Sequence, residues 1–218
     1  MASLKNVKLT YFGINAAATL PRMLLHYGKI PFENKMIKPE QWPELKPKVE
    51  FNFLPQLEVD GRNYAQSHAI NTYIARHLDL MGQNIEEEYQ INSVLNCSAD
   101  LGVHYYKVFM SRDEKDLSPE GKKENLAAAI AKIESIYGTL EARYSKLGNK
   151  KYYLGDRISV ADFHFATMGL FHFGSVGKEL LEKPTKRIAP NLSKLSERII
   201  TEDVKSFVES DLAIKNSI

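Results

Sequence analysis

Cysteine is almost missing from this chain, which has Cys97 as its one thiol in 218 residues. An internal disulfide is therefore excluded, and no pair of thiols is available for metal binding or redox chemistry. A reducing, cytoplasmic compartment is expected. Long apolar runs are also lacking, because no stretch approaches the roughly 20 apolar residues that cross a bilayer and residues 1–10 lack the apolar core of a signal peptide. No membrane partner is expected.

An excess of either charge is lacking as well. The chain has 29 basic and 27 acidic side chains, so no broad positive field exists that could neutralise many phosphates. Nucleic acid is not an expected partner. With 44% apolar and 26% charged residues the composition is that of an ordinary globular protein, and the length suits one or two domains.

The first 80 residues alternate between strand and helix patterns. Asp60-Gly61 separates two alternating segments and is a typical two-residue hairpin turn. Ser67 stands where it could cap the helix that follows. The expected strands are 7–12, 32–37, 56–59 and 62–65, and the expected helices are 16–27 and 67–78, with a short helix or irregular turn over 40–49.

After residue 82 the strand patterns stop and helical periodicity takes over. Ser159-Val160-Ala161-Asp162 has the form of a capping box, in which Ser159 and Asp162 each satisfy a free amide at a helix start. The expected helices are 85–110, 119–147, 159–173, 191–199 and 202–208. This order fits an α/β thioredoxin-like N-terminal domain over 1–82 and an all-α C-terminal domain over 83–218.

Several motifs, in this order and spacing, are together specific to one family. They are Leu9-Thr10-Tyr11-Phe12, Gln41-Trp42-Pro43-Glu44-Leu45-Lys46, Leu54-Pro55-Gln56-Leu57-Glu58-Val59-Asp60, Gln66-Ser67-His68-Ala69-Ile70 and Ser159-Val160-Ala161-Asp162-Phe163. On these residues the chain resembles the glutathione transferases over essentially its full length. The Trp-Pro-Glu-Leu-Lys segment resembles the sigma class, which includes glutathione-dependent prostaglandin D synthases and S-crystallins.

The resemblance implies a catalytic role for Tyr11. A free thiol has a pKa of about 8.5, and its thiolate is the nucleophile, so such an enzyme must stabilise the anion. A hydroxyl hydrogen bond to a charged acceptor contributes roughly 1.5–3 kcal/mol, which lowers a thiol pKa by about one or two units. Without the neighbouring motifs, a tyrosine that closes a strand is more often a packed core residue.

The resemblance also implies residues that bind glutathione, the co-substrate of this family, with no metal. Leu54, before a cis Pro55, would present its backbone N–H and C=O to the cysteinyl part. Gln66 and Ser67 would hold the γ-glutamyl part at a helix N-terminus, where an anion is favoured. The remaining candidates are Trp42 and Lys46 for the glycyl carboxylate, Phe53 beside the ligand backbone, and Asp100, which would reach the γ-glutamyl amine from the partner subunit of a homodimer.

Ordinary roles remain open for three of these residues. Ser67 could be a simple helix cap, Lys46 a solvated surface charge and Asp100 a surface carboxylate. An apolar electrophile is the expected second substrate. Its pocket is expected between the domains, with Gly13, Gly102, Tyr106, His164 and Met168 as candidates.

Two positions depart from the family pattern. Sigma-type members usually carry an arginine at the position of Ala17, and a polar residue often stands at the position of Phe53. On the shared motifs, the expected function is still a glutathione transferase that conjugates or isomerises apolar electrophiles. The alternatives are a weakly active or non-catalytic, crystallin-like homologue and an interaction domain like those fused to translation factors.

Overall fold

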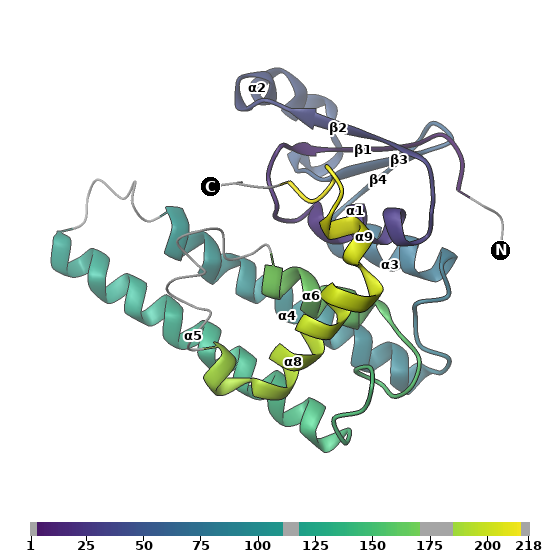
Figure 1. The fold of residues 1–218 in the computed structure, drawn as a ribbon. Coiled ribbons are helices and arrows are strands. Elements are labelled where there is room, and N and C mark those ends of the chain that lie inside the picture. Colours follow the sequence, from purple (N-terminus) through teal and green to yellow (C-terminus); the bar gives the residue numbers. More distant parts are fainter. Residues whose placement is uncertain (1–3, 111–117, 171–184, 215–218) are drawn as a thin grey trace.

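The computed structural model describes residues 4–110, 118–170 and 185–214, and the side chains of 98, 99, 105–110, 169 and 170 lie outside that description. A small sheet with its helices lies above a larger group of helices (Figure 1). The expected fold class, a thioredoxin-like part followed by a helical part, is confirmed. No helix in the described part is both long and apolar enough to cross a membrane.

The sheet has four strands in the order β2-β1-β3-β4. β1 is parallel to β2 and antiparallel to β3, and β3 and β4 form a hairpin. Asp60 and Gly61 have φ values of 50° and 78°, as a primed hairpin turn requires, so the predicted turn is confirmed. The strands occupy the expected positions: β1 (Val7–Phe12), β2 (Phe32–Ile37), β3 (Gln56–Val59) and β4 (Arg62–Ala65).

Helices α1 (Thr19–Tyr27) and α3 (Ser67–His77) pack against each other beside the sheet. α1 begins three residues later than expected and therefore has Pro21 in its first turn, where a missing N–H costs no helical hydrogen bond. Between β2 and β3 the expected short helix is α2 (Trp42–Leu45), which is flanked by 3-10 turns.

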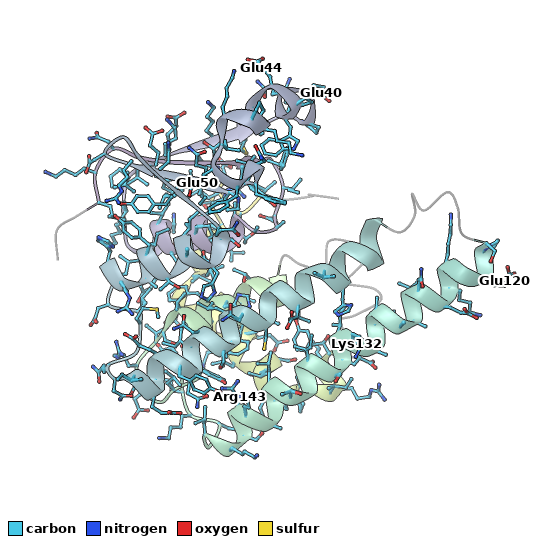
Figure 2. All side chains as sticks on the ribbon, turned by 180° about the vertical axis from the view of Figure 1, so that it is seen from behind. Glu40, Glu44, Glu50, Glu120, Lys132 and Arg143 are labelled. Atoms are coloured by element: carbon cyan, nitrogen blue, oxygen red, sulfur yellow. The ribbon has the colours of Figure 1, made fainter. Side chains whose placement is uncertain are left out.

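The rest of the chain is helical, with α4 and α5 packed side by side (Figure 2). α6 is buried over residues 160–168 and contacts α1, α3, α4 and α8, so it forms the centre of the helical part. The chain between α8 and α9 continues as a π-helical turn over Ile199–Asp203. The helices are α4 (Ile85–Met110), α5 (Pro119–Lys146), α6 (Val160–Leu170), α8 (Pro190–Arg198) and α9 (Lys205–Val208).

Asp162 caps α6 more extensively than the capping box predicts. Its buried carboxylate accepts hydrogen bonds from the backbone N–H of Ser159 at 2.8 Å and of Tyr153 at 2.7 Å. The expected reciprocal role of Ser159 is wrong, because the Asp162 N–H donates to the Ser159 carbonyl oxygen at 3.0 Å and not to its hydroxyl, which itself donates to the Asp162 carboxylate at 2.9 Å. Burial raises the pKa of Asp162 to about 6, and these hydrogen bonds oppose that rise.

The segment between α3 and α4 is tied to the loop before α6. Arg157 donates to the carbonyl oxygens of Asp79 at 2.9 Å and Met81 at 2.8 Å, and the N–H of Val160 donates to that of Leu80 at 2.9 Å. These bonds join the sheet part to the helical part. The domain boundary after residue 82 falls within this segment and stays a prediction.

Candidate active site

The strand registers bring the N-terminal candidate residues to one edge of the sheet. Thr10 on β1 is opposite Gln56 on β3, and Gln56 is opposite Ala65 on β4. The residue after Thr10, the residues before Gln56 and the residues after Ala65 therefore share that edge. They are Tyr11, Leu54 with Pro55, and Gln66 with Ser67.

Tyr11 is largely buried, with 8% of its surface exposed. Its hydroxyl accepts a hydrogen bond from the backbone N–H of Ala17 in the loop between β1 and α1. Burial raises the pKa of the Tyr11 phenol, while the Ala17 N–H and the charge of Arg22 lower it. A phenol with a raised pKa keeps its proton at neutral pH. Because the Ala17 bond uses only a lone pair, that proton remains free for donation.

Leu54 precedes a cis peptide bond to Pro55, as predicted. The ladder between β1 and β3 ends at the pair Thr10–Gln56, so Leu54 lies beyond the paired part of the sheet. Its side chain is half-buried, and Pro55 is buried. The Leu54 backbone thus continues the strand direction at the edge that also holds Tyr11.

The start of α3 differs from the expected cap. Gln66 is the N-cap residue and Ser67 is the first helical residue, so the expectation that Ser67 caps this helix is wrong. The Gln66 side chain makes no cap hydrogen bond to the first turn of α3. Gln66 has φ 70° and ψ 114°, a conformation that costs a non-glycine residue about 1–3 kcal/mol. The strained backbone of Gln66 and the backbone N–H groups of the first turn of α3 therefore lie next to each other at this edge of the sheet.

The other predicted glutathione-binding residues lie on or beside α2, directly before Leu54, and on α4. Trp42 on α2 makes an edge-to-face contact with Phe12, with ring centroids 5.8 Å apart. Lys46 is exposed, and Phe53 is 68% exposed just before Leu54. Glu40 and Glu44 lie at the far tip of the α2 segment (Figure 2). Asp100 is exposed on α4 in the helical part.

The predicted electrophile pocket is only partly described. Gly13 is exposed at the end of β1, and a Cβ there would lie 3.8 Å from the Met36 sulfur. Gly102 is exposed on α4, whereas His164 and Met168 on α6 are buried at 4% and 1% exposure. The side chain of Tyr106 lies outside the described residues. The assignment of these residues to a pocket stays a prediction.

Arg22 is a residue of the site that the sequence reasoning missed. It is fully buried on α1, and its guanidinium carbon lies 5.8 Å from the centroid of the Tyr11 ring. The available signal was its position: Arg22 is four residues after Ala18 and three before Leu25, on the apolar face of the predicted helix. A charged residue on such a face is rarely fully buried without a specific role.

Comparison with known proteins agrees with this geometry. Residues 7–76 match the family model "Glutathione S-transferase, N-terminal domain", and residues 99–203 match "Glutathione S-transferase, C-terminal domain". "Probable glutathione S-transferase 7" of Caenorhabditis elegans is 36% identical over 71% of this chain and 74% of its own length. "Hematopoietic prostaglandin D synthase" of Gallus gallus is 30% identical over 73% and 76%, respectively.

Solved structures agree in fold. The glutathione S-transferase from Ascaris lumbricoides has a TM-score of 0.77 and 28% identity, covering 94% of this chain and 96% of that one. The sigma class enzyme of Fasciola hepatica has a TM-score of 0.77 and 25% identity, covering 98% and 97%. Family models, relatives and structures point to the same group, and the chain belongs to the glutathione S-transferase family, with sigma-class members among its similar structures.

Proposed function

We propose that this protein binds glutathione at the sheet edge, ionises its thiol with Tyr11 and delivers the thiolate to an apolar electrophile. The observation that carries the proposal is the meeting of Tyr11, the Leu54 backbone before cis Pro55 and the start of α3 at one edge of the sheet. The Ala17 N–H bonds a lone pair of the Tyr11 hydroxyl and leaves the phenolic proton available for an acceptor. A thiolate sulfur at that point would accept a charge-assisted hydrogen bond, the stronger kind.

The chemical step needs no oxidant, reductant or metal. In conjugation of chlorodinitrobenzene, the thiolate attacks the carbon that bears chlorine, a C–S bond forms, the C–Cl bond breaks and chloride leaves with the electron pair. The thiol proton goes to solvent before the attack. Tyr11 stabilises the anion that attacks, which raises the fraction of reactive glutathione at neutral pH.

The rest of the sheet edge suits the remainder of the tripeptide. The Leu54 backbone lies beyond the β1–β3 ladder and is positioned to pair with the cysteinyl backbone of glutathione, like an added strand. The N-terminus of α3, where the Gln66 side chain makes no cap hydrogen bond, suits the γ-glutamyl carboxylate beside Gln66 and Ser67. Trp42 and Lys46 are assigned to the glycyl carboxylate, which would be the least buried part of the ligand.

A weakly active or purely ligand-binding protein is the second candidate. It is favoured by Ala17, which offers a backbone amide but no cationic side chain, and by Phe53, which is 68% exposed and apolar. Isomerisation of a prostaglandin endoperoxide is a variant of the first candidate, suggested by the similarity to prostaglandin D synthases. The cytoplasmic location expected from the sequence also stays a prediction.

Two measurements on the purified protein separate these candidates. An active transferase is retained on immobilised glutathione, is eluted by free glutathione and conjugates chlorodinitrobenzene well above the uncatalysed rate. Retention without turnover supports the ligand-binding candidate, and absence of retention contradicts both. Conversion of a prostaglandin endoperoxide is then compared with conjugation, and conjugation alone leaves a general transferase.

We also propose that two copies of the chain form a homodimer. Phe51 and Phe53 are large apolar side chains that are 59% and 68% exposed, and Phe51 has φ 57°, which presents it on a strained turn. Tyr89 and Val103 on α4 are 60% and 55% exposed. Burial of these side chains against a second copy would also allow Asp100 to reach the partner's glutathione.

The dimer predicts a concentration-dependent mass. Light scattering is expected to give about twice the 24.8 kDa of one chain for the wild type. Phe51→Asp is expected to shift the protein to the monomer because it removes apolar contact and buries an unpaired charge, whereas Phe51→Tyr keeps the ring and the dimer. A wild type that remains at the mass of one chain at micromolar concentration contradicts this proposal.

A further inference from the structure

Arg22 is a buried cation whose hydrogen-bond partners among the described residues are all neutral. Its Nε donates to the side-chain oxygen of Asn34 on β2 at 3.0 Å. Its two terminal nitrogens donate to the carbonyl oxygens of Ile14 at 3.0 Å and Phe12 at 3.1 Å. The side chain is fully buried. Such a cation costs several kcal/mol to desolvate, so its retention without a counterion requires an explanation.

Within the described part of the chain, no carboxylate neutralises Arg22. Glu33 and Lys35 flank Asn34 on β2, but strand alternation points them to the opposite face of the sheet, and both are exposed. His26, one turn along α1, is hydrogen-bonded to Ser206. Burial lowers the Arg22 pKa to about 10, and Tyr11, which could oppose this only as a phenolate, is neutral at neutral pH, so the guanidinium stays charged there without a counterion among the described residues.

The Arg22 guanidinium reaches the loop that carries the proposed reaction. Two of its acceptors, Phe12 and Ile14, lie directly after Tyr11, and Ala17, whose N–H bonds the Tyr11 hydroxyl, lies in the same loop. The guanidinium carbon is 5.8 Å from the Tyr11 ring centroid. Arg22 therefore fixes the loop on one side of Tyr11 and places a full positive charge beneath its ring.

We propose that Arg22 is a positioning residue for the reaction, and that its unneutralised charge supports the thiolate through Tyr11 where the side chain of Ala17 cannot. This inference rests on the proposed function. An elementary charge at roughly 7 Å, in an effective dielectric of about 20, contributes about 2 kcal/mol, which is large enough to shift an ionisation by between one and two pH units. The neutral amide of Asn34 is essential to this effect, because a carboxylate there would cancel the charge.

Asn34→Asp tests the inference with almost no change in shape. The new carboxylate would accept the same Nε hydrogen bond and neutralise Arg22. We expect the pH midpoint of kcat/KM for chlorodinitrobenzene conjugation to rise by about one unit relative to wild type. Asn34→Ala is the matched control: it removes the same hydrogen bond without adding charge, so it is expected to lower thermal stability and leave the midpoint within about 0.2 units.

The outcomes separate this inference from the proposed function. A midpoint that rises in Asn34→Asp and not in Asn34→Ala supports the inference. Midpoints that are equal in Asn34→Asp and wild type, while Tyr11→Phe raises the midpoint, overturn the inference alone, as does an equal rise in both Asn34 variants. A wild type that is inactive, or whose midpoint equals that of free glutathione, overturns the inference and the proposed function together.

Discussion

Tyr11→Phe is expected to lower kcat/KM for chlorodinitrobenzene conjugation by about 10- to 100-fold at neutral pH. The variant keeps the buried ring, which contacts Phe12 at a centroid distance of 5.6 Å, and loses only the hydroxyl. The lost hydrogen bond to a charged sulfur contributes roughly 1.5–3 kcal/mol, which sets the size of the effect. Steady-state kinetics with saturating glutathione measure it.

The pH profile identifies the cause of that loss. Burial raises the pKa of the Tyr11 phenol, so Tyr11 remains a donor across the range in which the thiol ionises. Without this donor the thiol pKa rises, the midpoint of kcat/KM moves up by about one to two units, and the variant approaches wild-type activity at alkaline pH. A matched control is Tyr27→Phe at the C-terminal end of α1, which is expected to leave the pH midpoint of kcat/KM unchanged. A loss of activity that is equal at every pH contradicts a role in ionisation.

Asp162→Ala is expected to lower the free energy of unfolding by about 3–5 kcal/mol. The substitution removes the acceptor of the Tyr153 and Ser159 backbone amides and of the Ser159 hydroxyl, and it leaves these donors buried. Each buried donor without a partner costs about 1–3 kcal/mol. Since α6 lies at the centre of the helical part and contacts α1, the loss affects the whole chain. Urea denaturation followed by far-ultraviolet circular dichroism measures it.

Ser159→Ala is the control for the capping interaction. It removes only the hydroxyl donor, while the Asp162 carboxylate keeps both backbone N–H bonds, so we expect a loss of about 1 kcal/mol. An equal loss in both variants would show that the hydroxyl, rather than the carboxylate, carries the stability of this helix start. A loss below about 1 kcal/mol for Asp162→Ala would contradict the assigned role of the carboxylate.

Local sequence patterns were sufficient for the order of the elements and for most of their bounds. The expected starts of two helices, at residues 16 and 202, are wrong because α1 begins at Thr19 and α9 at Lys205, and residues 171–173 of the expected helix 159–173 lie outside the described residues. Strand alternation in β1 and β3 and the Asp60-Gly61 turn depend on neighbouring residues, and the structure confirms them. The start of α3 was predicted less well. Ser67 is of the preferred N-cap type and Gln66 is not, so the structure departs here from local preference. The N-cap position depends on how β4 enters the helix, which is a tertiary property.

The site itself needed the registers of the strands. Sequence motifs named Tyr11, Leu54 and Gln66, but only the pairing of Thr10 with Gln56 and of Gln56 with Ala65 brings them to one edge. Arg22 was missed because arginine is rarely buried, although its helical position places it on the apolar face of α1. Its burial is explained by the carbonyl oxygens of the β1–α1 loop, which come within reach only when the loop folds over α1.

Titration of the thiol of bound glutathione, followed by the ultraviolet absorption of the thiolate, tests the central claim most directly. For the wild-type complex we predict a thiol pKa about one to two units below the free value of about 8.5, and for the Tyr11→Phe complex a return toward that value. A wild-type complex whose thiol ionises at the free value would contradict the assignment of Tyr11 as the group that activates glutathione.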